Sequence, residues 1–122
     1  MAEQPRGASA LKNDGLPSIS VEELAALMVS DPAVQVVDAR PRNYVSRNPD
    51  TMPRAIWRDP DAVDDWCGQL SPEAAVFVYC AYGFEVGCKV ATLLRQRGFD
   101  ARYVRGGLAA WNGAAGSRAS AR

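Results

Sequence analysis

Cys80 is the residue of this 122-residue chain whose surroundings are best suited to chemistry. It follows residues 75–79, a continuous apolar run typical of a central parallel strand covered on both faces. A loop at residues 81–85 then leads into an amphipathic helix. Such a loop can turn its backbone N–H groups toward the sulfur, and the helix N-terminus adds a partial positive charge. We therefore expect a cradle that favours thiolate over thiol and that stabilises a bound persulfide anion or an attacked oxyanion.

The absence of histidine limits the mechanisms open to this thiol. A Ser-His-Asp triad, a Cys-His dyad and an HExxH zinc site are all excluded, so a nucleophile here must be activated by lowering its own pKa. The other cysteines, Cys67 and Cys88, form no CxxC pair and no metal-ligand spacing with Cys80. We expect neither a disulfide scaffold nor a zinc site, and no metal or organic cofactor is implied.

Composition narrows the class of protein further. The chain has 14 Lys plus Arg against 14 Asp plus Glu, so a net charge of zero gives no electrostatic case for nucleic acid or a membrane surface as partner. No apolar run approaches the ~20 residues of a membrane span, and the start lacks the apolar region of a signal peptide. We predict a cytoplasmic protein with reduced thiols. One domain is expected at residues 17–113, between a flexible leader at 1–16 and a flexible tail at 114–122.

The first half of the chain supplies two strands and the starts of two helices. Ser20 and Glu23 have the spacing of a capping box, which predicts a helix that ends near residues 30–32. Residues 34–38 are rich in β-branched side chains and are typical of a buried strand, and residues 55–57 predict a second, short strand. Asp59 and Pro60 predict the start of a further helix, with Asp59 as its N-cap. The apolar stripe of that helix is Val63, Trp66, Cys67 and Leu70.

The second half repeats the alternation of strand and helix. The helix after Cys80 has an apolar side and closes at Gly98. That side comprises Val86, Val90, Leu93, Leu94 and Arg97. A last strand at residues 102–105 leads through the turn at Gly106 and Gly107 into a short helix near Trp111, a residue expected in the core. The alternation predicts an α/β fold with a central parallel β-sheet flanked by helices on both faces.

Two charged residues follow the strand at 34–38. Asp38 could orient the Cys80 loop by accepting hydrogen bonds, or it could serve a plain cap or turn. Arg40 could raise the local potential near the thiolate, or it could pair structurally with a carboxylate. Both are therefore candidates for supporting roles at the site, because parallel strands end at one edge of the sheet.

The cysteines also have less specific interpretations. Cys80 itself could be a buried structural thiol. Cys67 shares an apolar stripe, so core packing explains it. Cys88 lies about 200° around an ideal helix from Val86, which directs it away from the core; it could still act as a resolving thiol for Cys80.

Three segments together resemble the rhodanese family. They are residues 36–40 (Val-Val-Asp-Ala-Arg), residues 78–85 (Val-Tyr-Cys-Ala-Tyr-Gly-Phe-Glu) and residues 102–111, which end in Gly-Gly-Leu-Ala-Ala-Trp. The resemblance covers most of residues 17–113 and implies a rhodanese-like fold and sulfurtransferase activity. It implies that Cys80 carries sulfane sulfur as a persulfide. The substrate-binding loop would comprise Ala81, Tyr82, Gly83, Phe84, Glu85 and Val86, with the aromatic rings of Tyr82 and Phe84 candidates for the substrate mouth.

Two segments depart from the family pattern. Residues 50–55 keep the Pro and Ala of a Gly-His-Ile-Pro-Gly-Ala stretch but lack its His and both Gly. Glu85 stands where thiosulfate-using members often have Arg, and a carboxylate at the rim of an anion pocket disfavours a dianionic donor. Alternatively, Glu85 points into solvent, where the helix N-terminus stabilises it. The loop also loosely resembles that of rhodanese-like proteins associated with chromate resistance.

These observations predict a sulfurtransferase that uses a Cys80 persulfide. Its partners would be a small-molecule donor, thiosulfate or a low-molecular-weight persulfide, and a thiophilic acceptor, which could be a protein. One alternative is a rhodanese-like module that binds or regulates a partner. The other is an enzyme that handles oxyanions such as arsenate, chromate or phosphate. The lack of an Arg clamp weighs against it, because the sixth residue after Cys80 is Val86.

Overall fold

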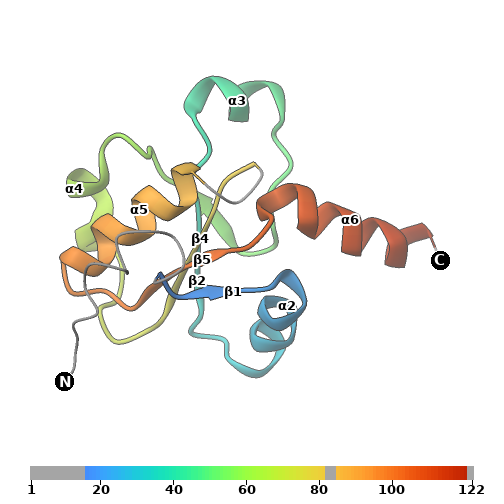
Figure 1. Cartoon of the computed structure of the whole chain (residues 1–122), viewed down its shortest axis with the longest axis horizontal. Helices are drawn as coiled ribbons and strands as arrows, with labels where there is room; N and C mark the ends of the chain where they lie inside the picture. Colours follow the sequence, from blue (N-terminus) through green and yellow to red (C-terminus); the bar gives the residue numbers. More distant parts are fainter. Residues whose placement is uncertain (1–15, 82–84, 121–122) are drawn as a thin grey trace.

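A parallel sheet runs through the molecule, and β4 lies at its centre (Figure 1). The computed structural model describes residues 16–81 and 85–120. Within these residues the sheet has five strands in the order β1-β5-β4-β2-β3, and every neighbouring pair is parallel. The strands are β1 (Ser18–Ile19), β2 (Gln35–Asp38), β3 (Ala55–Trp57), β4 (Val76–Tyr79) and β5 (Ala101–Val104). The two-residue strand β1 was not predicted, because it is too short to show a period.

Helices cover both faces of the sheet, as predicted. The helices are α2 (Val21–Ser30), α3 (Arg42–Arg47), α4 (Val63–Trp66), α5 (Glu85–Gln96) and α6 (Gly107–Ser120), and a 3-10 turn (Cys67–Gln69) follows α4. On one face α2 and Leu108 of α6 pack against Phe77 and Tyr79. On the other face α4 and α5 pack against Val76 and Val78. The alternating residues of the apolar strand β4 therefore enter two separate cores, and the predicted α/β class is confirmed.

The capping box at the start of α2 is present as predicted. The Glu23 backbone N–H donates to the Ser20 hydroxyl at 3.0 Å, and the Ser20 N–H donates to the Glu23 carboxylate at 2.9 Å. Leu24 and Met28 of this helix are buried. The C-terminal end of α2 receives the guanidinium of Arg54, which donates to the carbonyls of Met28 (2.6 Å) and Asp31 (3.2 Å).

Arg54 also shows how the departure at residues 50–55 is accommodated. Its φ of 72° is a left-handed conformation that glycine adopts most easily. The family pattern has a Gly at this place, a residue that adopts such a φ without steric cost. Its two hydrogen bonds to the end of α2 offset part of the cost of this conformation.

The prediction that Asp59 caps a helix starting at Pro60 was wrong. Helix α4 begins only at Val63, after Ala62, and has no side-chain cap. The carboxylate of Asp59 accepts instead from the Asp61 N–H at 2.9 Å, forming a local turn that competes with a helical start. The predicted apolar stripe is nevertheless confirmed, because Val63, Trp66 and Leu70 are buried.

Two helices differ from the sequence prediction. Helix α3, six residues with none buried, was not predicted because it shows no apolar period. Helix α6 continues to Ser120, whereas an unstructured tail was expected from residue 114. Alanine, which recurs through residues 109–119, has the highest intrinsic helix propensity, and this favours the longer helix. In Figure 1 this helix extends away from the sheet. The predicted leader at 1–16 falls, except for its last residue, outside the described part of the chain.

The turn before α6 needs its glycines. Gly106 and Gly107 have φ values of 79° and 57°. A Cβ on Gly106 would lie 2.4 Å from the Cβ of Ala110, so a larger residue would collide with the first turn of α6. This turn sets the position of α6 beside the carboxyl end of the sheet. Among the described residues, no helix has the length and apolar character needed to cross a membrane.

Candidate active site

Cys80 lies where the central strand ends. Its side chain is 7% exposed, and it directly follows Tyr79, the last residue of β4. The neighbouring strand β2 ends at the same edge, because Asp38 and Tyr79 are partners in register and the Ala39 N–H donates to the Tyr79 carbonyl at 2.8 Å. The predicted position of Cys80 at the carboxyl edge of a parallel sheet is therefore what the fold shows.

Two helix N-termini meet the backbone around Cys80. The first turn of α6 donates from Leu108 N–H to the Cys80 carbonyl and from Ala109 N–H to the Ala81 carbonyl, both at 2.9 Å. From the other side, the first turn of α5 packs on the sulfur: a Cβ on Gly87 would lie 3.7 Å from the Cys80 Sγ. The helix that follows the loop thus places its N-terminal, positively polarised end against the thiol.

Most of the predicted substrate loop falls outside the described residues. Tyr82, Gly83 and Phe84 are not described, nor is the side chain of Glu85, so their parts in the cradle stay predictions. Ala81 is half-buried, and Val86 packs against the core that α5 shares with the sheet. The structure thus places the two ends of the loop beside Cys80.

Asp38 and Arg40 form an ion pair that is completely buried. Arg40 Nε lies 2.9 and 3.1 Å from the two carboxylate oxygens, and Nη2 lies 2.8 Å from one of them. Burial acts to lower the pKa of Arg40, but the hydrogen bond and charge of Asp38 outweigh it and raise that pKa above its ordinary value. Of the two roles considered for Arg40, structural pairing is thus observed, and an effect on the thiolate stays a prediction.

The same guanidinium holds the segment that follows α3. Arg40 donates to the carbonyls of Asn48 and Asp50, each at 2.9 Å, and its guanidinium lies 5.6 Å from the ring centroid of Tyr44. The Tyr79 hydroxyl accepts from the N–H of Met52 at 3.1 Å. The ends of β2 and β4 therefore both anchor residues 44–52, which sequence reasoning did not connect with the site because the contacts are long-range.

A pocket of about 380 Å³ lies between α3 and α6, next to Ala81; we call it the α3–α6 pocket. Its walls come from the α3 region and from the first turns of α6. They comprise Arg40, Tyr44, Arg47, Asn48, Pro49, Asp50, Ala81, Leu108, Ala109 and Asn112. Because Leu108 and Ala109 bond to the carbonyls of Cys80 and Ala81, this pocket adjoins the backbone of the candidate nucleophile.

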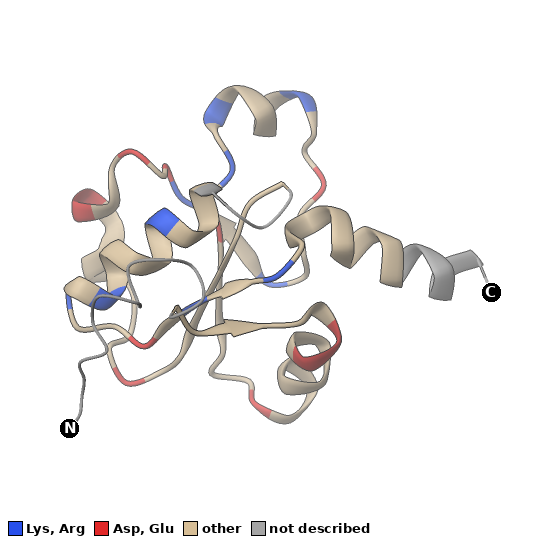
Figure 2. Cartoon of the chain, in the orientation of Figure 1, with Lys and Arg blue, Asp and Glu red and all other residues tan. Residues whose placement is uncertain are grey.

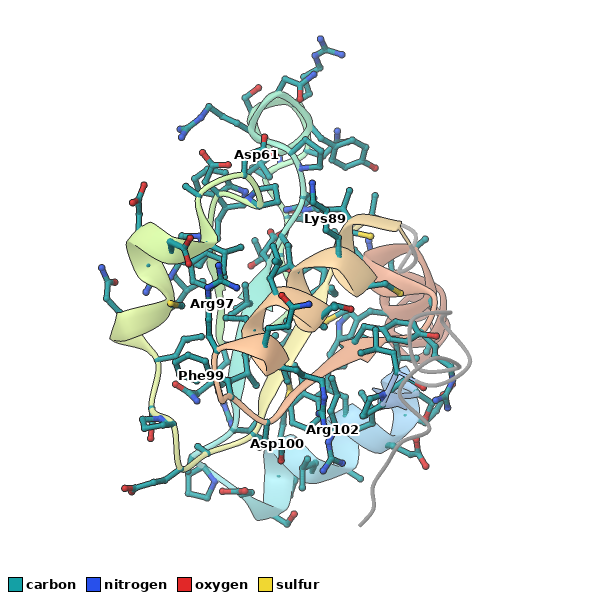
Figure 3. The ribbon with its side chains drawn as sticks, turned by 60° about the vertical axis from the view of Figure 1, so that its left-hand side comes forward. Asp61, Lys89, Arg97, Phe99, Asp100 and Arg102 are labelled. Atoms are coloured by element: carbon teal, nitrogen blue, oxygen red, sulfur yellow. The ribbon has the colours of Figure 1, made fainter. Side chains whose placement is uncertain are left out.

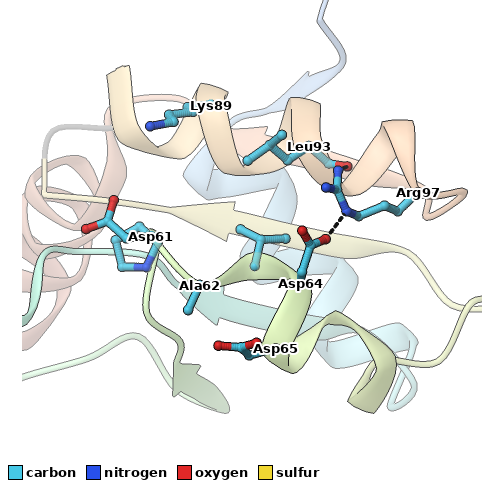
Figure 4. A pocket seen from close by; sticks show the side chains of 9 residues that line it. Asp61, Ala62, Asp64, Asp65, Lys89, Leu93 and Arg97 are labelled. Atoms are coloured by element: carbon cyan, nitrogen blue, oxygen red, sulfur yellow. Dashed lines mark hydrogen bonds and ion pairs between the residues drawn. The ribbon is translucent and has the colours of Figure 1, made fainter.

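A larger pocket of about 490 Å³ lies elsewhere, between residues 60–65 and the outer side of α5 (Figure 4). An ion pair between Arg97 and Asp64 crosses it, and Lys89 lies at the other end of its α5 wall. Figure 3 shows Asp61, Lys89 and Arg97 on this side of the molecule. Neither Cys80 nor Ala81 lines this pocket. We therefore do not assign the chemistry of the Cys80 thiol to it, although it is the larger of the two pockets.

The prediction that Cys88 points away from the core was wrong. Cys88 is 6% exposed, and Gly87 is buried beside it, whereas Lys89 is exposed. The first turn of α5 packs more deeply than the stripe of the whole helix suggests. Burial raises the pKa of Cys88 to about 11, and the nearby charge of Cys80 adds to the effect. Cys67 packs against the core of the α4–α5 face, as predicted. The described residues contain no cluster of three His, Cys, Asp or Glu side chains that could hold a metal ion.

The fold and this edge define an open parallel α/β protein with a cysteine at the end of its central strand. The model of the rhodanese-like domain family matches residues 20–114, and the chain belongs to this family. No curated protein matches the chain.

Solved structures agree with the assignment. A rhodanese-like domain protein from Staphylococcus aureus is 28% identical, with a TM-score of 0.70; the match covers 79% of this chain and 91% of that one. The reduced Bacillus anthracis CoADR-RHD is 17% identical with a TM-score of 0.74, over 93% of this chain and 19% of that one. A Rhodopseudomonas palustris protein of unknown function, described as a possible tyrosine phosphatase, is 20% identical with a TM-score of 0.72, over 94% and 96%. The last two show likeness of fold alone.

Proposed function

We propose that this protein transfers sulfane sulfur through a persulfide on Cys80. The observation that carries the proposal is the buried position of Cys80 at the end of β4, with the first turn of α5 packed against its sulfur. A helix N-terminus stabilises a neighbouring anion, and both a thiolate and a persulfide anion are such groups. Family membership supports sulfur transfer in general, and the donor and acceptor belong to this proposal.

The reaction runs in two balanced half-steps. The Cys80 thiolate attacks the outer sulfur of the donor, the S–S bond of the donor breaks, and sulfite or an organic thiolate leaves. An acceptor nucleophile, a small thiophile or a protein thiol, then attacks the outer sulfur of the Cys80 persulfide. The Cys80 thiolate leaves with its electron pair and is ready for the next cycle. Each step is written for a deprotonated attacking group, so neither step requires a histidine as base.

The test is the intact mass of the protein after treatment with thiosulfate and, separately, with glutathione persulfide. We expect one added sulfur on the wild type and none on Cys80→Ser. Cys67→Ser is the matched control, because Cys67 lies in the 3-10 turn after α4 and is not part of the site; this variant should load like the wild type. A wild type that gains no sulfur from either donor would contradict the proposal and favour a module that binds a partner.

Comparing the rates of loading from the two donors tests the predicted effect of Glu85. Preference for the organic persulfide would support the prediction that Glu85 disfavours a dianionic donor. Oxyanion chemistry would appear as turnover of an aryl phosphate or of arsenate, and we expect none. The chromate-resistance subtype stays a prediction.

A further inference from the structure

The α3–α6 pocket is larger than an inorganic sulfur donor requires. Its volume of about 380 Å³ falls within the range of roughly 300–1,000 Å³ found for small-molecule sites. A water molecule takes up ~30 Å³ in the liquid, so the pocket has room for about a dozen heavy atoms. Thiosulfate has far fewer heavy atoms and would leave most of this space to water. The volume instead suits the organic part of a larger donor.

The charges that line the pocket are of both signs. Arg40 is buried and engaged with Asp38, so this pair contributes little net charge. Arg47 and Asp50, both exposed, are the other charged residues in the lining, and neither forms an ion pair with a described side chain. Figure 2 shows positive charge on α3 and negative charge in the segment that follows it. The pocket therefore offers one cation and one anion to a ligand.

The remaining lining is held in place by the fold. The Asn48 side chain donates to the Tyr44 carbonyl at 3.1 Å, and Arg40 fixes the backbone of Asn48 and Asp50. On the opposite wall, the first turn of α6 is bonded to the backbone of Cys80 and Ala81. A ligand bound between these walls would thus lie beside the backbone of Cys80 and Ala81, with Arg47 and Asp50 in the lining of its pocket.

From this juxtaposition we propose that the α3–α6 pocket binds the organic part of the sulfur donor, an amino acid persulfide. Arg47 engages its carboxylate and Asp50 its ammonium group. This inference rests on the proposed function and names the donor class. The transfer is balanced: the Cys80 thiolate attacks the outer sulfur of R–S–SH, the donor S–S bond breaks, and R–S⁻ leaves as the Cys80 persulfide forms. No further oxidant or reductant takes part.

The experiment measures the rate of sulfur loading on Cys80 with three donors. Cysteine persulfide carries both charged groups, the persulfide of N-acetylcysteine methyl ester carries neither, and thiosulfate is inorganic. The variants are Arg47→Gln and Asp50→Asn. The matched control is Arg42→Gln, which removes the same charge from the same helix but outside the pocket, where Arg42 pairs with Asp59 and lies over Trp57.

We expect Arg47→Gln and Asp50→Asn each to lower kcat/KM for cysteine persulfide about fivefold, the effect of one partly exposed charged contact. Loading from the neutral persulfide should stay unchanged, and Arg42→Gln should behave as wild type with every donor. Equal losses with all three donors, or no loss with cysteine persulfide, would overturn the inference while leaving sulfur transfer intact. A wild type that loads from none of the three would overturn the proposed function together with the inference.

Discussion

Strands β2 and β4 lie side by side and end at the same edge of the sheet, but the chain beyond them differs sharply. At the end of β2, Asp38 and Arg40 form a completely buried ion pair, and Arg40 donates hydrogen bonds to the segment at residues 48–50. After β4, Cys80 is contacted by backbone from the first turns of two helices. The contacts described at the end of β2 thus involve charged side chains, and those described at the end of β4 involve main-chain groups.

The two strand ends differ in the groups that surround them, and this difference suggests different roles for them. Helix N-termini stabilise negative charge through main-chain N–H groups, whereas the side chains of Asp38 and Arg40 neutralise each other's charge. The buried ion pair instead positions residues 44–50, which form a wall of the α3–α6 pocket. We infer that the β2 end shapes the site and that the β4 end performs the chemistry.

The largest expected effect comes from breaking the β2 end. Asp38→Asn leaves the Arg40 charge buried without its counter-charge, which costs about 3–5 kcal/mol of unfolding free energy. Urea denaturation of purified protein measures this loss. The control is Asp64→Asn, which breaks the more exposed ion pair with Arg97 and should change stability little. A similar small loss for both variants would contradict a special role for the buried pair.

Tyr79→Phe tests the link between the two ends. The Tyr79 hydroxyl of β4 accepts from the Met52 N–H in the segment that follows β2, and its removal leaves that buried amide without its partner. We expect a loss of about 1–3 kcal/mol in the free energy of unfolding. Tyr44→Phe removes a hydroxyl from a half-buried ring and should have little effect. If the two variants were equally stable, the link would contribute nothing measurable.

The stability of the protein at alkaline pH tests the burial of Cys88, which lies in the first turn of α5 near Cys80. Burial raises the pKa of this thiol from 9.0 to about 11, so the folded protein holds the proton more tightly than the unfolded chain. The resulting stabilisation is present below about pH 9 and is lost as the pH rises toward about 11, with a change on the order of 2 kcal/mol. Denaturation across this range should show a shallower decline for Cys88→Ala than for wild type. Cys67→Ala should retain the wild-type decline, and an identical decline in all three proteins would refute this origin.

Gly87→Ala is expected to have the smallest effect on stability among these variants. The new Cβ would stand 3.7 Å from the Cys80 Sγ, an ordinary contact, and alanine in a helix is more stable than glycine by roughly 0.5–1 kcal/mol. If the outer sulfur of a Cys80 persulfide lies against α5, the methyl group would occupy part of its space. We expect a slightly higher melting temperature together with slower sulfur loading.

Gly113→Ala in α6 is the matched control for Gly87→Ala, because a Cβ there meets nothing within 4 Å. It should leave sulfur loading unchanged. Loading at the wild-type rate in Gly87→Ala would show that the added sulfur does not lie against α5.

Local patterns predicted much of the frame around the site. The apolar run of β4, the capping box of α2 and the helix that closes at Gly98 are encoded in neighbouring residues, so they could be read directly. The same patterns placed Cys80 at the carboxyl edge of a parallel sheet. The prediction at Asp59 was wrong because its side chain had two local partners to choose from, the start of a helix and a turn, and composition cannot decide between them.

Periodicity and capping over a few neighbouring residues were therefore enough to predict strands β2 to β5 and the place of Cys80 after β4. The pairing of Arg40 with Asp38, the burial of Cys88 and the pocket that α3 and α6 enclose beside the Cys80 backbone depend on tertiary packing. Helices α3 and α6 are separated by most of the domain, so their meeting depends on how the sheet brings distant segments to one edge. Burial and long-range pairing are properties of that packing, and no local pattern records them.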